Sequence, residues 1–386
     1  MKKKLDVRIE EIRVRDIGAY ALEQAKGDGM ITISRTRGTA WANNPLADPD
    51  DVALLVAHVD DRAVGYFGLM TGMVRNPETG DRPMTFASTW FVDPNLKGGG
   101  VGGKLMRHSF GLGRDVVLTN LSDDAGTVSK ALGLVHLDPL PYWHANLLDT
   151  KGLSLPFLAA RKLGNRLDMR EDERYRPVLL AGRHLSRDGL YAGLMLPLLP
   201  LLREIRTAEI AAIDSTMEEA HDRWAPKRFL RTKEVVNWML NDPWVMVRPR
   251  TAEDDRYYFD DHRRFFRRVA LRIEGKDGRD KGFVIIRSHE DSWGTRHTAM
   301  FDHLLHDPAD YRYAFAVAMR EAAYARADEI SLPDGCAKSI EGSPIYARIF
   351  ARKKRTYVYK PAPDSPIDAV KDDIALFFAD SDVAFC

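Results

Sequence analysis

Several residue types and patterns are scarce in this chain, and each scarcity excludes a class of protein. Two cysteines, Cys336 and Cys386, are too few for a disulfide framework or a thiolate metal site, which fits a reducing compartment. The formal net charge is only +1, so the strong basic field of a general nucleic-acid binder is missing, and we expect no nucleic-acid partner. With 386 residues, 45% of them hydrophobic, the chain is long enough for two globular domains.

A hydrophobic run long enough to cross a membrane is also missing. The longest run covers residues 190–202, shorter than the roughly 18–20 residues that a transmembrane helix needs, and Pro197 and Pro200 interrupt it. The first residues lack the apolar stretch of a signal peptide, so we expect a cytoplasmic protein. We interpret the run as a buried connector between domains. The alternative is peripheral membrane contact, because the run is flanked by Arg183, Arg187, Arg203 and Arg206.

Signatures of several common active sites are absent from the sequence. No Gly-Lys-Ser/Thr closes a glycine run, as a P-loop would require, and no Gly-x-Ser-x-Gly elbow points to a hydrolase. Three histidines and an aspartate gather in the second half, but their spacing matches no compact ligand set, so we expect no metal site. These residues are His297, Asp302, His303 and His306.

Hydrophobic patterns predict an α/β domain in the first part of the chain. Residues 52–59 and 63–70 are typical of a hairpin joined at a polar turn. A strand at 84–92 ends at a proline, a glycine cluster follows, and a helical pattern starts at Val101. The remaining predicted elements are a strand at 116–121 and a helix at 125–134.

The same order of elements recurs at low similarity in the second part, which predicts a duplicated fold. The recurring elements are strands at 267–273, 281–287 and 299–305, a helix at 308–326, a strand at 330–332, a helix at 343–351 and a strand at 355–360. We therefore expect a first domain at 1–150, a helical connector at 151–215 and a second domain at 216–386. The long helix of the second domain follows Asp307-Pro308 without a glycine cluster, which distinguishes the two repeats.

The most informative motif is the glycine-rich segment between the strand at 84–92 and the helix that begins at Val101. It reads Val-Asp-Pro-Asn-Leu-Lys-Gly-Gly-Gly-Val-Gly-Gly-Lys-Leu over residues 92–105. Glycine allows a backbone to approach a ligand closely, and the free amide groups at a helix N-terminus favour an anion. This combination predicts a pyrophosphate-binding loop, and the alternative is a flexible turn without a ligand.

The motif resembles the acyl-CoA signature of the GNAT N-acetyltransferase superfamily: a basic or Gln residue, two residues, Gly, one residue, then Gly or Ala. Lys97, Gly100 and Gly102 fill those places. The resemblance implies tandem GNAT-like acyl-CoA N-acyltransferase folds, with mixed sheets flanked by helices and a degenerate second repeat. It also implies that acetyl-CoA is the co-substrate and that its arm runs between the strands at 85–92 and 116–121. The residues expected to bind CoA are Phe91, Val92, Lys97, Gly98, Gly99, Gly100, Val101, Gly102, Gly103 and Lys104.

The reaction that the resemblance implies is direct transfer of an acetyl group to the amine of a small molecule. No covalent enzyme intermediate is needed, a backbone N–H would stabilise the oxyanion, and proximity could supply much of the rate. The stretches 227–238 and 380–385 are similar to bacterial two-domain GNAT proteins, some associated with polysaccharide synthesis, which suggests an amino-sugar acceptor. Two alternatives are a non-catalytic CoA-binding or scaffold protein and an aminoacyl-tRNA-dependent transferase. The near-neutral charge argues against the transfer-RNA alternative.

The sequence defines the catalytic residues less well than the loop. Many GNAT proteins carry a tyrosine acid in the helix after the fifth strand, where this chain has Ser129, which is either a substitute or an ordinary helix residue. Tyr142 could act as the acid instead, or anchor the domain edge. Asp123 could take a proton from the amine through water, or cap the next helix. Ser88 and Trp90 could line the acceptor pocket or pack in the core.

Overall fold

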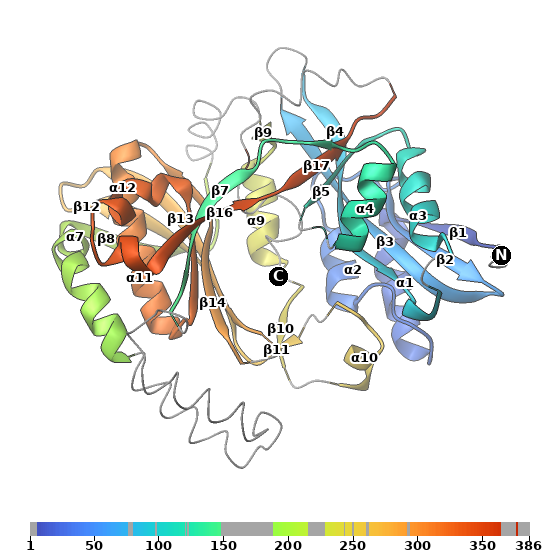
Figure 1. Ribbon diagram of the computed structural model, residues 1–386, viewed down its shortest axis with the longest axis horizontal. Coiled ribbons are helices and arrows are strands. Elements are labelled where there is room, and N and C mark those ends of the chain that lie inside the picture. The colour runs from blue at the N-terminus through green and yellow to red at the C-terminus, as the bar shows by residue number, and fades with distance from the viewer. Residues whose placement is uncertain are drawn as a thin grey trace. The chain divides into compact units, whose positions relative to one another are not determined.

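The computed structural model forms two compact units, each built on its own sheet (Figure 1). The first unit comprises Met1–Leu140, Ala211–Arg264 and Lys354–Cys386, and the second comprises Pro141–Ile210 and Phe265–Lys353. The structure describes residues 6–75, 80–96, 99–119, 121, 123–147, 188–214, 228–242, 244–248, 251–259, 262–291, 294–363 and 376. The predicted fold class, α/β with mixed sheets flanked by helices, is confirmed in both units.

A mixed sheet forms the centre of the first unit. Its strands lie in the order β1 (Arg8–Arg13), β2 (Val52–Val59), β3 (Arg62–Arg75), β4 (Arg82–Val92), β5 (Asp115–Thr119), β17 (Tyr357–Lys360) and β6 (Val135–His136). The short β9 (Arg228–Phe229) pairs with the far end of β3. The helices are α1 (Val14–Lys26), α2 (Arg35–Ala42), α3 (Val101–Phe110), α4 (Asp123–Ala131), α9 (Lys233–Asn241) and α10 (Ala252–Asp255), with the short turn η1 (Pro94–Leu96) and the strand pair β10 (Met246–Val247) and β11 (His262–Arg263). β4 and β5 run parallel, whereas their other described neighbours in this sheet are antiparallel.

The two faces of the first sheet carry different helices. Leu105 and Met106 of α3 join a hydrophobic core with Phe67 of β3, and we call this side the α3 face. Neighbouring residues of a strand point to opposite faces, so Gly68 belongs to the other side. Trp41 of α2 packs over Gly68 there, and we call that side the α2 face. Both faces are therefore covered, and each is identified by one helix.

The hairpin β2–β3 has the turn that its sequence predicts. Asp60 and Asp61 join the strands with φ angles of 49° and 56°. Two successive residues with positive φ form the type of turn whose twist matches a hairpin, and aspartate tolerates that conformation better than most residues. The observed bounds of β2 agree with the predicted range 52–59.

A second mixed sheet forms the centre of the second unit. Its strands lie in the order β8 (Ile205–Ile210), β12 (Phe266–Gly275), β13 (Asp280–Glu290), β14 (Arg296–Leu305), β15 (Glu329–Pro333), β7 (Leu140–Asn146) and β16 (Phe350–Arg355). The helices and short turns are η2 (Leu196–Leu198), α7 (Leu199–Glu204), η3 (Pro308–Asp310), α11 (Tyr311–Ala325), η4 (Asp334–Cys336), α12 (Ala337–Glu341) and α13 (Tyr346–Ile349). β14 and β15 are parallel, as β4 and β5 are in the first sheet.

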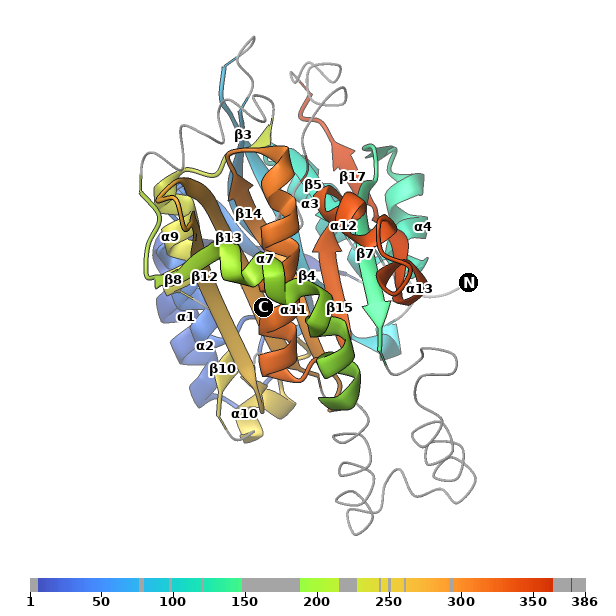
Figure 2. The ribbon, with the colours of Figure 1, turned by 90° about the vertical axis from the view of Figure 1, so that its left-hand side faces the viewer.

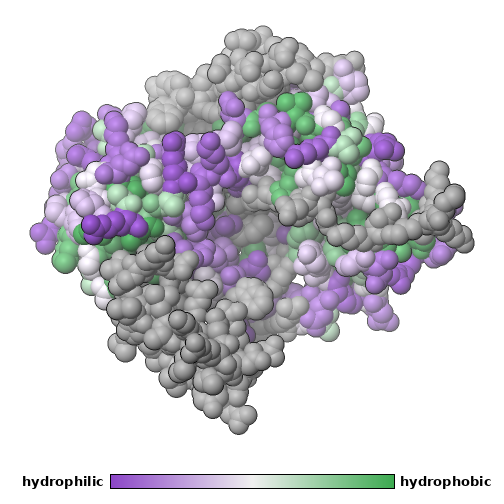
Figure 3. All heavy atoms as spheres, viewed as in Figure 1, coloured by the Kyte–Doolittle hydropathy of each residue, from purple (hydrophilic) through white to green (hydrophobic). Residues whose placement is uncertain are grey.

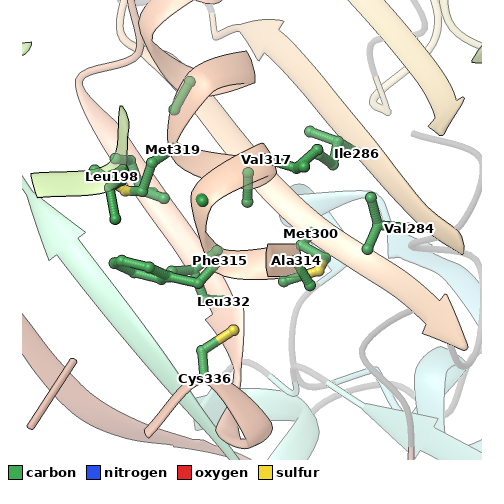
Figure 4. Close-up of a cluster of buried hydrophobic side chains, with 14 of the residues drawn as sticks. Leu198, Val284, Ile286, Met300, Ala314, Phe315, Val317, Met319, Leu332 and Cys336 are labelled. Carbon is green, nitrogen blue, oxygen red and sulfur yellow. The ribbon is translucent and has the colours of Figure 1, made fainter. Parts of the chain in front are cut away.

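The core of the second unit lies between its sheet and α11. Figure 2 shows α11 lying along one face of this sheet. Figure 4 shows Phe315, Val317 and Met319 of α11 among strand side chains such as Ile286 and Met300. These side chains are almost completely buried, so this unit has a closed core of its own.

The two units exchange one strand each. β7 follows the first sheet in the chain but pairs with β15 in the second sheet, and β17 follows the second sheet but pairs with β5 in the first. In Figure 1, β17 accordingly lies beside β5 and β7 beside β16. The expected boundaries at 150 and 216 therefore differ from the units of the structure, because local sequence patterns do not reveal which sheet a strand joins.

Three further expectations need correction. Residues 205–210, expected within the connector, form β8 at the edge of the second sheet. The stretch 228–238, expected to open the second domain, contributes β9 and α9 to the first unit. The helix expected at 343–351 is limited to Tyr346–Ile349, and β16 follows it at Phe350.

The run at 190–202 is half-buried along its length. Tyr191, Leu194 and Leu198 enter the core of the second unit, whereas Leu196 and Leu199 are exposed. The prediction of a buried connector therefore holds only for the side of the run that carries the three buried residues. Arg183 and Arg187 lie outside the described residues. Within the part of the chain that the structure describes, no helix combines the length and hydrophobicity needed to cross a membrane.

β16 is an edge strand of the second sheet and is strongly polar. Its residues from Ala351 to Lys354 are exposed, and three of these four are cationic. Hydrophilic residues gather over this strand on the face shown in Figure 3. Lysine and arginine on an edge strand oppose pairing with another sheet, so this edge is protected against aggregation.

Candidate functional site

The parallel strands β4 and β5 separate after three residue pairs. They are paired at Met84–Asp115, Thr85–Val116 and Phe86–Val117, and no later pair joins them among the described residues. β4 nevertheless continues to Val92 and remains paired with β3, while β5 remains paired with β17 as far as Thr119. The sheet therefore opens towards the carboxyl ends of β4 and β5, where a ligand can lie between their unpaired backbone edges. This opening, between 87–92 of β4 and 118–119 of β5, is called the strand opening below.

A tight turn leads from β4 to the glycine segment. The Asp93 carboxylate accepts hydrogen bonds from the backbone N–H of Asn95 at 2.9 Å and from its side-chain amide at 3.0 Å. Arg62 Nη2 donates to the same carboxylate at 2.7 Å. The backbone hydrogen bond from Asn95, supported by these other contacts, lowers the pKa of Asp93 below its usual range. Asp93 therefore stays ionised and holds the chain at the point where it leaves the sheet.

Gly100 starts α3 in a conformation that suits glycine. Its φ is 79°, in the left-handed region, and a Cβ there would have no neighbour within 4 Å. Its carbonyl accepts the first bond of the helix, from the N–H of Lys104 at 3.0 Å. The amides of Val101, Gly102 and Gly103 precede that bond and so have no acceptor within the helix. Three donors thus gather at the positive end of the helix dipole, an arrangement that favours an anion.

Two of the following glycines differ in what surrounds them. A Cβ on Gly102 would lie 3.0 Å from the Trp90 ring, so this glycine permits close packing between α3 and β4. A Cβ on Gly103 would have nothing within 4 Å. A side chain at Gly103 would therefore meet none of the described atoms closely and should not disturb the fold. Lys97 and Gly98, which the signature also involves, lie outside the described residues.

β4 carries a bulge beside the strand opening. Gly68 pairs with Ser88 and Phe67 with Trp90, so Thr89 is an extra residue, with a φ of 40°. A positive φ at threonine costs on the order of 1–3 kcal/mol, and such strain is typical of functional sites. The ladder between β3 and β4 leaves the backbone of the bulged residue unpaired, which provides a backbone N–H for a ligand.

Trp41 covers this bulge from the α2 face. A Cβ on Gly68 would lie 2.5 Å from the tip of the Trp41 ring and 2.5 Å from Thr89 Oγ1, so glycine admits both groups. The indole Nε1 of Trp41 is buried and has no hydrogen-bond acceptor among the described residues. A buried donor without a partner is energetically costly.

The predicted catalytic residues belong to two different units. Ser129 of α4 is buried and donates its hydroxyl to the Gly126 carbonyl at 2.8 Å, a bond within its own helix. Asp123 is the first residue of α4, and its side chain lies outside the description. Tyr142 lies on β7 and therefore in the sheet of the second unit. Of the predicted site residues, the structure brings together the end of β4 and the start of α3.

The strand exchange brings a tyrosine to the opening that sequence reasoning missed. Tyr357 of β17 pairs with Thr119 at the end of β5. Its neighbour Val358 belongs to the core on the α3 face, so Tyr357 is on the α2 face. The Tyr357 ring is buried, with the Arg355 guanidinium 5.2 Å from its centre, and Arg355 also donates to Thr119 Oγ1 at 2.9 Å. Tyr142 holds the equivalent place in the second sheet, which explains why the sequence order pointed to it.

The second unit has the same strand opening with a different entrance. β14 and β15 pair at three positions, the last being Ala299–Ser331, and then separate. The following helix has no glycine segment. The Asp307 carboxylate caps the turn before α11 by accepting from Ala309 N–H at 2.7 Å, and Asp310 pairs with Lys281 Nζ at 2.8 Å. Two carboxylates therefore lie where a diphosphate would need free amides.

The first residue of α11, Tyr311, packs against η4 and β14. A Cβ on Gly335 would lie 2.2 Å from the Tyr311 ring, so the ring packs directly on this glycine. The Tyr311 hydroxyl also lies 2.7 Å from His303 Nε2 of β14. The ring and its partners connect α11, η4 and β14 of the second unit. The Tyr311 ring therefore occupies space at the start of α11, where α3 of the first unit begins with open glycines.

Comparison with known proteins gives similarity at the level of solved structures. No protein-family model matches the sequence, and no curated protein matches it significantly. The chain is similar over 92% of its length to 73% of a GCN5-related N-acetyltransferase from Anabaena variabilis, with 9% identity and a TM-score of 0.48. A GCN5-related N-acetyltransferase from Kribbella flavida gives 13% identity and 0.45, covering 92% of this chain and 71% of that one. A tandem GNAT protein from the clavulanic acid biosynthesis pathway gives 12% identity and a TM-score of 0.45. The similarity covers 93% of this chain and 100% of that one. Such weak similarities do not establish a function.

Proposed function

We propose that the first unit is an acyl-CoA-dependent N-acyltransferase of the GNAT type. The observation that carries the proposal is the position of the α3 N-terminus, with its free amides and open glycine, at the end of two parallel strands that separate. A diphosphate bound at Val101–Gly103 would direct the pantetheine arm into the strand opening, where the backbone edges of β4 and β5 can hold its amides.

The chemistry needs few protein groups. The nitrogen of a neutral amine attacks the thioester carbon, a C–N bond forms, the C–S bond breaks, and the thiolate of CoA takes a proton. The N–H at the Thr89 bulge would stabilise the oxyanion, and we propose Tyr357, which pairs with the end of β5, as the group that protonates the thiolate. Tyr142 remains a second proposal for the acid, and Asp123 is proposed as the base that takes, through water, the proton that the nitrogen loses. Holding both reactants in one geometry supplies much of the acceleration.

The acyl group and acceptor follow from the resemblance rather than from the geometry. We propose acetyl-CoA as the simplest donor and a small-molecule amine, such as an amino sugar of a polysaccharide, as acceptor. A cytoplasmic protein would meet both. In the second unit the carboxylates of Asp307 and Asp310 and the Tyr311 ring support a structural role without CoA.

One observation favours a non-catalytic CoA-binding protein as the second candidate. Ser129, which stands where many GNAT proteins have their acid, donates its hydroxyl within its own helix. Release of free thiol from acetyl-CoA with pooled amines and amino sugars distinguishes the candidates. CoA binding without thiol release above the rate with no amine would favour the non-catalytic protein.

The test of the CoA site is the Gly103→Leu variant. A leucine side chain at this open position would lie over the free amides, so we expect CoA affinity to fall at least tenfold by calorimetry. Gly193→Leu is the matched control, because Gly193 is also helical and a Cβ there has nothing within 4 Å. Both changes replace a helical glycine and should not lower the melting temperature. Equal CoA affinity in the two variants would contradict the proposal.

A further inference from the structure

Three consecutive aromatic residues, Tyr257, Tyr258 and Phe259, follow the short helix α10 in the first unit. The Tyr257 ring is buried and stacks on the ring of Tyr66 in β3, with ring centres 6.2 Å apart. Tyr66 precedes Phe67, which points to the α3 face, so Tyr66 points to the α2 face. The three aromatic residues therefore lie over the α2 face of the first sheet.

A group of aromatic rings borders the strand opening on this face. Phe91, near the end of β4, pairs with Tyr66 and so points to the same face. The Tyr258 ring lies against the Phe91 ring, with centres 4.7 Å apart and planes tilted by 35°. The Phe259 ring meets the Tyr258 ring edge to face at 5.1 Å. The rings of Phe91, Tyr258 and Phe259 are called the aromatic wall below.

The aromatic wall is accessible from outside. Tyr258 is 67% exposed, and Phe91 and Phe259 are partly exposed. A single exposed aromatic side chain is ordinary, but apolar side chains that gather on a surface are typical of ligand-binding and interaction sites. The aromatic wall also lies beside the opening in which the thioester is proposed to bind, so a small-molecule ligand is the occupant that fits its position.

The segment that carries Tyr258 and Phe259 is fixed to α1, to α2 and to the loop between these helices. The Ile31 N–H donates to the Arg256 carbonyl at 3.1 Å, and Arg256 Nη2 donates to the Ala25 carbonyl at 2.9 Å. The Arg35 guanidinium donates to both carboxylate oxygens of Glu253, at 2.7 and 3.1 Å. These contacts pre-form the aromatic wall, so a ligand would not have to order it.

The α2 face is the side from which an acceptor amine can approach the thioester. α3, whose free amides would hold the diphosphate, packs on the α3 face, and the arm of CoA would occupy the strand opening itself. Phe91 lies two residues after the bulged Thr89, roughly 7 Å along the strand. An aromatic ring and an amine joined by two carbon atoms span a similar distance, at about 1.5 Å per bond. A ring on the aromatic wall can therefore place its amine at the bulge.

We infer that the aromatic wall binds the acceptor and that the preferred acceptor is an amine joined to an aromatic ring by a short chain. The inference rests on the proposed function, because the thioester must lie in the strand opening, and it narrows the acceptor from small-molecule amines in general. Stacking or edge-to-face contact with each ring of the wall should strengthen binding roughly two- to tenfold. A sugar would bring hydroxyl groups against the same rings, and a hydroxyl that loses water without gaining a partner weakens binding.

The experiment measures thiol release from acetyl-CoA by the full chain with 2-phenylethylamine, n-butylamine or glucosamine as acceptor. The test variant is Tyr258→Ala, because a side chain that is 67% exposed can be removed with little cost to the fold. Tyr324→Ala, at a tyrosine of the second unit that is 73% exposed, is the matched control. Calorimetry with CoA alone shows in each variant whether the CoA site is intact.

We expect kcat/KM in the unaltered protein to be at least tenfold higher for 2-phenylethylamine than for n-butylamine or glucosamine. Tyr258→Ala should lower kcat/KM for 2-phenylethylamine about tenfold, through a higher KM, and leave the value for n-butylamine and the CoA affinity unchanged. Tyr324→Ala should change none of these quantities.

Two sets of results would contradict the inference in different ways. Equal kcat/KM for the aromatic and the aliphatic amine, a preference for glucosamine, or an equal loss for both amines in Tyr258→Ala would overturn the acceptor class and leave the proposed function intact. Absence of CoA binding, or CoA binding without turnover of any amine, would overturn the proposed acyl transfer and the acceptor class together.

Discussion

The two units use one sheet design with two different entrances. In each, a pair of parallel strands is joined by three residue pairs and then opens, and the first strand of the pair carries a bulge, at Thr89 in one unit and Phe301 in the other. In the first unit the opening leads to a helix that starts with glycines. In the second it leads to two aspartates and a tyrosine ring. The two units therefore share one arrangement of strands and differ in the few residues at the helix start, which we expect to determine whether an anion can bind.

The difference between the entrances is electrostatic as well as steric. At α3 the first turn has no acidic residue, and the helix dipole faces open space at Gly103. At α11 the Asp307 carboxylate takes a backbone donor that a ligand would use, and Lys281 pairs with Asp310 instead of remaining available to an anion. The two units therefore differ in charge and in available donors at the helix start rather than in strand geometry.

We expect the largest effect on CoA affinity when the start of α3 receives an acidic residue, such as those found before α11 in the second unit. Gly103→Asp places a carboxylate beside the proposed diphosphate, so we expect CoA affinity to fall by about a thousandfold, since like charges in contact cost several kcal/mol. The same change should not weaken the helix, because an acid in the first turn is favourable. Calorimetry and thermal unfolding measure the two quantities. A parallel Gly193→Asp variant should bind CoA normally, and a loss there would mean that added charge acts non-specifically.

Tyr357 and Tyr142 lie at equivalent positions of the two exchanged strands, so their variants show which of them protonates the thiolate. If Tyr357 protonates the thiolate, Tyr357→Phe should lower kcat about a hundredfold and leave CoA affinity unchanged. Tyr359→Phe is the matched control, a buried tyrosine on the same strand. Steady-state rates with a saturating amine provide the measurement. A larger loss in Tyr142→Phe than in Tyr357→Phe would return the role to Tyr142.

Replacing Gly335, on which the Tyr311 ring packs, should lower the stability of the second unit and leave CoA binding by the first unit unchanged. Gly335→Ala places a methyl group 2.2 Å from the Tyr311 ring, so the ring must move, and we expect the free energy of unfolding to fall by about 2 kcal/mol. CoA affinity should stay the same. Chemical denaturation with and without CoA tests both statements. Loss of CoA affinity at unchanged stability would show that the second unit takes part in binding.

The smallest effect concerns His297 of the second unit. Burial works to lower its pKa, but hydrogen bonds to Glu329 and Asp291, both at 3.1 Å, outweigh it and raise the pKa above the usual value. The stabilising contribution is therefore full below about pH 6.5 and is lost as the pH rises through the raised pKa. His297→Gln should lower the melting temperature at pH 5.5 and change it less at pH 9. A difference between variant and parent that grows with pH would contradict this assignment.

The sequence predicted local features well and long-range pairing poorly. The hairpin at 52–70, the glycine start of α3 and the missing glycines before α11 were predictable, because each depends on a few adjacent residues. The pairing of β17 with β5 could not be predicted, because the residues of β17 do not indicate which of the two sheets the strand joins. For the same reason Tyr357 was missed, and the segment 229–239 was assigned to the wrong unit. Trp41 also gave no local signal, because its role depends on Gly68 and on the bulge.

The exchange of β7 and β17 has a consequence for how the protein is made. Neither half of the gene encodes a complete unit, because β5 is translated long before the strand that will lie beside it. At bacterial-type speeds of roughly 5–20 residues per second, the ribosome needs on the order of ten seconds or more to reach β17. During that interval the nascent first sheet exposes an unprotected edge, so chaperone demand should peak late in synthesis, and cutting the gene between the repeats should yield two insoluble fragments.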